Sequence, residues 1–158
     1  MVDTAAVLRS ARDAVIREHM EAENRLDFDA AIDTFGGHPR YELVATGQVF
    51  DGEEDVRHYY ASSRAAFPDQ RNEVHALHHA DDAVIVEFDL LGTNLGDFAG
   101  ASPTGREFRC RMAAVFEFAG DRITCERVYF DSGSILRQLG RLGGRSSERQ
   151  ADQKGRTS

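Results

Sequence analysis

The stretch REFRCRMAAVFEFAGDRITCERVYF, residues 106–130, decides the fold. Two runs with alternating apolar side chains flank the turn Ala119-Gly120-Asp121, which is the pattern of an antiparallel β-hairpin. We pair Phe118 with Arg122 across this three-residue turn. Because successive side chains of a strand point to opposite faces, one face of the hairpin then takes Cys110, Met112, Ala114, Phe116, Thr124, Glu126, Val128 and Phe130. This face is the more apolar one, and we expect it to be buried.

Glu126 is the single ionisable side chain on the face that we expect to be buried. A carboxylate among apolar side chains is destabilising unless it is paired, hydrogen-bonded or protonated. Its pKa should rise, which suits a carboxylate to general acid or base catalysis near neutral pH. The alternatives are that Glu126 meets a buried arginine or a helix cap, or that the register is shifted by one residue.

Apolar side chains at helical spacing predict three helices in the first half of the chain and a short one at its end. The residues expected to cap the first three are, in order, Asp3 or Thr4, Asp27 or Asp29, and Asp51 with Glu54 in a capping box. Residues 41–50 are predicted to form one strand between the second and third helices. Four more strands follow within residues 72–130, and SGSILRQLG, residues 132–140, is the last helix.

This order, α-α-β-α-β-β-β-β and a short C-terminal helix, predicts the α+β class with an antiparallel sheet. The length of 158 residues corresponds to one domain, which we place at residues 1–140. Residues 141–158 carry five basic and two acidic side chains and almost no apolar ones. We therefore expect this basic tail to be disordered.

Composition excludes several classes of protein. The net charge of −8, with no cluster of Lys and Arg, argues against nucleic acid as a partner. No apolar run approaches the roughly 20 residues of a membrane helix, and no signal peptide precedes the first helix, so we expect a cytoplasmic protein without a membrane partner. Cys110 and Cys125 lack the spacing of a structural metal site and are expected to be small buried side chains.

His19 continues the inward stripe of the first helix, at the edge of the cavity that Glu126 would face. The alternative for His19 is a hydrogen-bonded core residue. Tyr60 is a candidate for holding a ligand oxygen, although simple core packing is the alternative. Further ligand-contacting candidates are Phe88, Asn94, Met112, Val128 and Phe130. No metal site is expected, because the same-face pair His75 and His79 is too widely spaced for one ion.

Several short motifs, in this order and spacing, resemble those of SnoaL-like proteins in the nuclear-transport-factor-2-like superfamily, over residues 5–140. They are F-P-D at 67–69, T-G-R at 104–106, V-F-E-F at 115–118, D-R-I-T-C-E-R-V-Y-F-D at 121–131 and L-R-Q-L-G at 136–140. The resemblance implies a cone-shaped fold in which a curved sheet wraps a long helix around one deep pocket. It also implies a small apolar ligand, carboxylate acid/base chemistry without a cofactor, and a homodimer.

The resemblance has one informative departure. Epoxide hydrolases of this superfamily end their last strand on W-R-D-Y-F-D, and here Val128 stands in the place of the first, water-activating Asp. Epoxide hydrolysis by that mechanism is therefore not expected. Glu126 shares the face of Val128 and is a candidate for a displaced acid/base group, whereas Asp131 is expected to cap the last helix.

Three hypotheses follow from these residues. In the first, the protein is an enzyme that cyclises or isomerises a small apolar carbonyl compound, such as a polyketide- or steroid-like molecule. Glu126 abstracts or returns the proton, and His19, Tyr60 or Asn94 donates a hydrogen bond to the developing oxyanion. In the second, the pocket binds a hydrophobic ligand without turnover. In the third, the chain is a dimeric interaction domain with a filled core.

Overall fold

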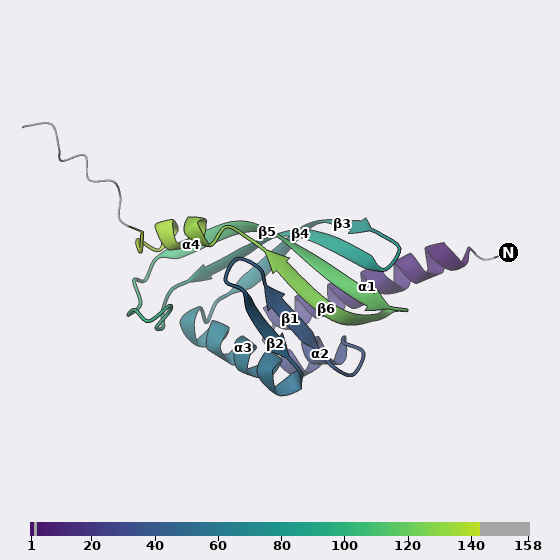
Figure 1. The fold of residues 1–158 in the computed structure, drawn as a ribbon. Coiled ribbons are helices and arrows are strands. Elements are labelled where there is room, and N and C mark those ends of the chain that lie inside the picture. The colour runs from purple at the N-terminus through teal and green to yellow at the C-terminus, as the bar shows by residue number, and fades with distance from the viewer. Residues whose placement is uncertain (2, 143–158) are drawn as a thin grey trace, which may run out of the picture.

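The computed structural model describes residue 1 and residues 3–142, and it has the α+β architecture that the sequence predicts (Figure 1). Its helices are α1 (Thr4–Asn24), α2 (Phe28–Asp33), α3 (Glu53–Ala66) and α4 (Ser132–Gln138). Its strands are β1 (Arg40–Leu43), β2 (Gln48–Asp51), β3 (Arg71–His79), β4 (Ala83–Thr93), β5 (Glu107–Ala119) and β6 (Arg122–Tyr129). One six-stranded sheet in the order β2-β1-β6-β5-β4-β3 curves over α1, with α3 beside the β1–β2 hairpin.

The side chains predicted to cap the helices do so in two cases of four; Asp131 is the N-cap residue of α4, but its side chain makes no capping hydrogen bond. The side chain of Asp3 accepts a hydrogen bond from Ala5 N at the start of α1, and Asp27 caps α2 in the same way. The capping box predicted for α3 is wrong. Its N-cap is Gly52 with φ 99°, a left-handed conformation that glycine adopts without a steric penalty, and no side chain caps this helix.

The single strand predicted for residues 41–50 is also wrong, because the chain folds back on itself there as the β1–β2 hairpin. Gly47 has φ 71°, and its N–H donates to Leu43 O at 2.9 Å, which closes the turn. β1 then pairs with β6 in parallel, and Tyr41 lies opposite Glu126. This pairing brings a segment from the first third of the chain to the candidate carboxylate.

Over most of the β5–β6 hairpin, the residues predicted to face the core are buried. The prediction is wrong only near the turn. Ala119 pairs with Arg122 across a two-residue turn, and a bulge at Thr124 inserts one extra residue in β6. Ile123 is therefore buried and Thr124 exposed, the reverse of the prediction. Beyond the bulge the parity is restored, so Glu126 and Val128 point inward as predicted.

Arg141 belongs to the folded domain, although the sequence analysis placed it in the tail. Its guanidinium donates to Phe98 O, Asn94 Oδ1 and Ser102 O. The remainder of the predicted disordered tail, from residue 143 onward, lies outside the described residues. Cys110 and Cys125 are buried free thiols. Within the described part of the chain, no helix is long and apolar enough to cross a membrane.

Candidate active site

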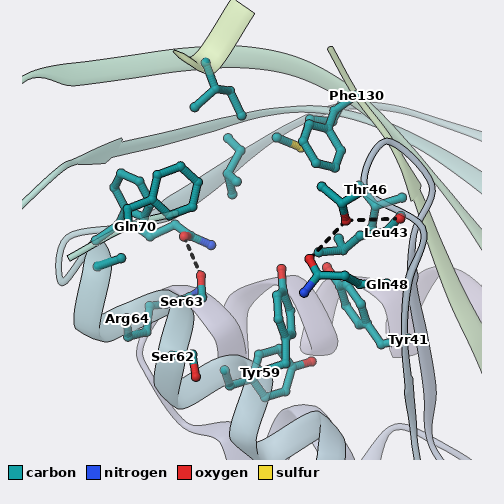
Figure 2. A pocket seen from close by; sticks show the side chains of 18 of the residues that line it. Tyr41, Leu43, Thr46, Gln48, Tyr59, Ser62, Ser63, Arg64, Gln70 and Phe130 are labelled. Atoms are coloured by element: carbon teal, nitrogen blue, oxygen red, sulfur yellow. Dashed lines mark hydrogen bonds between the residues drawn. The ribbon is translucent and has the colours of Figure 1, made fainter. Parts of the chain in front are cut away.

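A cavity of about 540 Å³ lies between the concave side of the sheet and helices α1, α3 and α4. In Figure 2, Thr46 and Gln48 of the β1–β2 hairpin face Ser63 and Gln70 across this space. Most of its wall is aromatic or aliphatic. Five of the ligand-contacting residues that the sequence predicts line it, namely Tyr60, Phe88, Met112, Val128 and Phe130. Whether they touch a ligand stays a prediction.

One polar part of the cavity wall is built around His19. Its ring is fully buried and packs edge-on against Phe35 and Phe116. Its Nε2 lies 2.9 Å from Glu126 Oε2 and 3.3 Å from Glu23 Oε1. Both carboxylates line the cavity, whereas His19 lies behind them. The structure thus brings the two predicted catalytic residues into contact and adds a second carboxylate.

The hydrogen bonds around His19 fix where its protons lie. The hydroxyl of Thr34 donates to Ala31 O at 2.6 Å, so its oxygen is free to accept from His19 Nδ1 at 2.9 Å. Nδ1 is therefore the protonated nitrogen of the neutral ring. A bond of 2.9 Å between Nε2 and a carboxylate oxygen then requires a further proton, carried either by the ring or by Glu126.

Burial and charge act in opposite directions on this pair. Burial raises the pKa of Glu126 to about 7, although the neighbouring His19 lowers it. Burial lowers the pKa of His19, but the neighbouring carboxylates of Glu126 and Glu23 outweigh it and raise the pKa to about 10. The two groups therefore hold an exchangeable proton between them at neutral pH.

The surroundings of Glu23 shift its pKa in the opposite direction from that of Glu126. Burial raises its pKa, but the neighbouring His19 and the charge of Arg64 outweigh this effect and keep the pKa below its usual value. Arg64 Nη2 lies 3.9 Å from Glu23 Oε2, and its guanidinium packs over the ring of Phe28. Tyr60, stacked on that same ring, brings its hydroxyl close to Glu23.

His19, Glu23 and Glu126 are also the residues that could hold a metal ion, since their donor atoms lie within 4.8 Å of one another. Two observations oppose a cation here. The separation of 2.9 Å between Nε2 and Oε2 is that of a direct hydrogen bond between the two groups. The guanidinium of Arg64 adds a positive charge beside Glu23. The geometry fits proton transfer better than metal binding.

Asn94 lies outside the cavity wall. Its side chain is fully buried and clamps a loop, donating to Gly96 O at 2.7 Å and accepting from Thr104 N and Arg141 Nη2, both at 3.0 Å. All of these partners belong to the loop or to the end of the domain. The structure therefore gives Asn94 no contact with the site in which the sequence analysis placed it.

Sequence reasoning missed Glu23, Arg64 and Tyr41 as members of the site. Glu23 had a detectable signal, because it lies four residues after His19 and thus on the same side of the helix. Arg64 and Tyr41 had none. They reach the cavity only because α3 and the β1–β2 hairpin each form part of its wall.

Comparison with solved structures supports the fold. AclR from Streptomyces galilaeus, a proposed hydroxylase, superposes with a TM-score of 0.74 at 21% identity, over 85% of this chain and 88% of its own. IdmH from Streptomyces antibioticus, a proposed polyketide cyclase, gives 0.71 at 25% identity, over 82% and 98%. SalBIII, an epoxide hydrolase/cyclase-like enzyme with a role in pyran ring formation in the polyether salinomycin, gives 0.68 at 22% identity, over 80% and 95%.

A comparison with curated proteins gives no match. The sequence profile described as SnoaL-like polyketide cyclase matches residues 13–139. This match includes His19, Glu23 and Glu126 and every strand of the sheet. The protein therefore belongs to the SnoaL-like polyketide cyclase family.

Proposed function

We propose that this protein catalyses proton transfer on a small, largely apolar carbonyl compound, without a cofactor, in a cyclisation or an isomerisation. The observation that carries the proposal is the buried His19–Glu126 pair, joined by a contact of 2.9 Å at the wall of an apolar cavity. IdmH and SalBIII, two structural relatives, are described in terms of ring formation, which is consistent with this chemistry.

The environment of the pair suits enolisation of a ketone. A carboxyl group with a pKa near 7 exists in both protonation states at neutral pH, which is the condition for efficient general acid–base catalysis. The carbon–hydrogen bond next to the carbonyl breaks, its electron pair forms the enol double bond, and the proton passes to a carboxylate. The buried hydroxyl of Tyr60, on the cavity wall, is the candidate donor to the oxygen that gains negative charge.

Exchange of hydrogen for deuterium tests this proposal without knowledge of the natural substrate. α-Tetralone, a bicyclic apolar ketone, is incubated with the protein in heavy water, and loss of the proton signal next to the carbonyl is followed by NMR. We expect Glu126→Gln to slow the exchange by about 100-fold. A chelator should leave the rate unchanged, because the step transfers only a proton.

The matched control is Glu87→Gln, which removes a carboxylate from the exposed face of β4, where Glu87 pairs with His78. Its exchange rate should equal that of the natural chain. If the natural chain exchanges α-tetralone no faster than Glu126→Gln does, the proposal is wrong.

The apolar wall of the cavity also favours a second candidate function, binding of a hydrophobic ligand without turnover. It predicts that α-naphthol, the aromatic analogue of the tetralone enol, binds to the natural chain and to Glu126→Gln with similar affinity and that neither exchanges α-tetralone.

The homodimer implied by the family resemblance stays a prediction, and sedimentation velocity tests it.

A further inference from the structure

The two carboxylates that flank His19 differ in what they contact. Glu126 Oε2 makes the hydrogen bond to Nε2 at 2.9 Å. Glu23 Oε1 lies 3.3 Å from the same nitrogen and has no hydrogen-bond partner in the described part of the chain. Both residues are more than nine-tenths buried, and both line the cavity.

A histidine nitrogen carries one proton, and the geometry directs that proton toward Glu126. The hydrogen bond is made to Glu126, whereas the contact with Glu23 is one of charge. Glu23 also lies 3.9 Å from the cationic Arg64, which favours its ionised form. Glu126 is therefore the carboxylate that shares a proton with His19, whereas Glu23 is ionised and its Oε1 is available to accept a proton.

Three of the groups around Glu23 favour this asymmetry, and Glu126 acts against it. His19, on its own helix, and Arg64, on α3, both favour the ionised carboxylate. Tyr60, also on α3, can only donate a hydrogen bond to it. Glu126, on β6, would repel a negative charge on Glu23. Its hydrogen bond to His19 reduces this repulsion, because the pair shares a proton.

We propose that Glu23 accepts the substrate proton, while Glu126, backed by His19, delivers a proton to the substrate oxygen. This assignment rests on the proposed function. The carbon–hydrogen bond next to the carbonyl breaks, its proton binds to a Glu23 oxygen, and the electron pair forms the carbon–carbon double bond. The carbonyl oxygen takes the proton of Glu126. The product is the neutral enol, and the reverse steps return the ketone, so atoms and charge balance.

The assignment predicts that catalysis and binding respond differently at the two residues. α-Naphthol resembles the enol and presents its hydroxyl where the substrate oxygen would lie. Glu126 should contact that oxygen and Glu23 should not. Substitution of Glu126 should therefore weaken both α-naphthol binding and tetralone exchange, whereas substitution of Glu23 should slow exchange alone.

The experiment compares the natural chain with Glu23→Gln, Glu23→Asp, Glu126→Gln and the control Glu87→Gln. Exchange of α-tetralone is measured by NMR in heavy water, and α-naphthol binding is measured by its own fluorescence. In Glu23→Gln we expect exchange to fall by about 100-fold, with the naphthol dissociation constant unchanged within about twofold. Retained naphthol binding also shows that the variant is folded. Glu23→Asp, which keeps a carboxylate, should recover part of the rate.

Three results overturn the assignment, and they differ from one another. If Glu126→Gln loses exchange and Glu23→Gln keeps it, the proposed function stands but Glu23 is not the proton acceptor. If no substitution in the site changes the exchange rate, the proposed function fails and the assignment fails with it. Loss of naphthol binding in both Glu23→Gln and Glu23→Asp would show that Glu23 shapes the site and does not accept the proton.

Discussion

His19 Nε2 lies 2.9 Å from Glu126 Oε2, although 107 positions separate the two residues in the chain. The contact forms because α1 runs along the concave side of the sheet, where β6 presents its buried face (Figure 1). Both side chains are buried, so loss of either one would leave its partner with an unpaired polar atom. The proton chemistry of the site and the stability of the fold are therefore coupled at this contact.

That coupling can be measured with a double-mutant cycle. His19→Leu leaves a buried carboxylate without its partner and should lower the free energy of unfolding by about 3–5 kcal/mol. His19→Leu combined with Glu126→Leu removes both groups and should cost clearly less than the sum of the two single substitutions, with a coupling of about 2 kcal/mol. Urea denaturation of the four proteins gives these values. Additive costs would show that the two side chains stabilise the fold independently.

The exchange reaction should depend on pH on both sides of neutrality. The proton acceptor Glu23 must be ionised, so the rate falls as the pH drops through its pKa. Delivery requires a proton on Glu126, whose pKa is raised by burial to about 7, so the rate also falls as the pH rises through that value. Arg64→Gln removes a charge that lowers the pKa of Glu23 and should move the acid limb to higher pH. An unmoved acid limb would contradict the role of Arg64.

Tyr60→Phe separates ligand binding from stability. The hydroxyl of Tyr60 is buried and has no partner of good geometry among the described residues. Its removal should leave the free energy of unfolding unchanged or raise it by up to about 1 kcal/mol. The affinity for α-naphthol should fall, because the hydroxyl would donate to the ligand oxygen. Thermal denaturation and fluorescence titration measure the two effects. A loss of stability would show that the hydroxyl already has a partner in the free protein.

Asn94→Ala tests the structural role that the fold gives to this residue. The substitution removes three hydrogen bonds of a buried amide and should lower the free energy of unfolding by about 1–3 kcal/mol. Affinity for α-naphthol should change little, since Asn94 does not line the cavity. A selective loss of affinity at unchanged stability would restore Asn94 to the binding site.

Asp89, on the outer face of the sheet, should contribute to the pH dependence of stability. Hydrogen bonds from Arg111, Arg109 and His75 hold the pKa of its carboxyl well below the usual value. The contribution is present above the pKa of the unfolded chain, about 3.9, and is lost as the pH falls toward the folded pKa. Asp89→Asn should therefore be destabilised at neutral pH, and its deficit should shrink in acid.

Urea denaturation at neutral pH and at about pH 3 checks this expectation. Glu87→Gln, which removes an exposed carboxylate from the same strand, is the matched control and should change little at either pH. A deficit of Asp89→Asn that is constant with pH would contradict the prediction.

The sequence by itself determined the class of fold and the inward position of Glu126. Both follow from local pattern, since the period of side chains along a strand places Glu126 and Val128 on the face of Met112 and Phe116. The alternation holds even though the turn was assigned one residue too long, because the bulge at Thr124 restores the parity. A period-two pattern records which face a residue occupies, but not which residue it pairs with.

Only the tertiary structure decided which groups surround Glu126. His19 and Glu23 come from α1, Arg64 from α3, and Tyr41 from a strand that pairs with β6 in parallel. Their convergence depends on how the helices cross the sheet and on the unforeseen β1–β2 hairpin. The sequence analysis expected Asn94 to lie in the site. In the structure its buried amide instead bonds to a loop and to Arg141. Contacts between distant segments arise from packing, and the local pattern of a single sequence does not encode them.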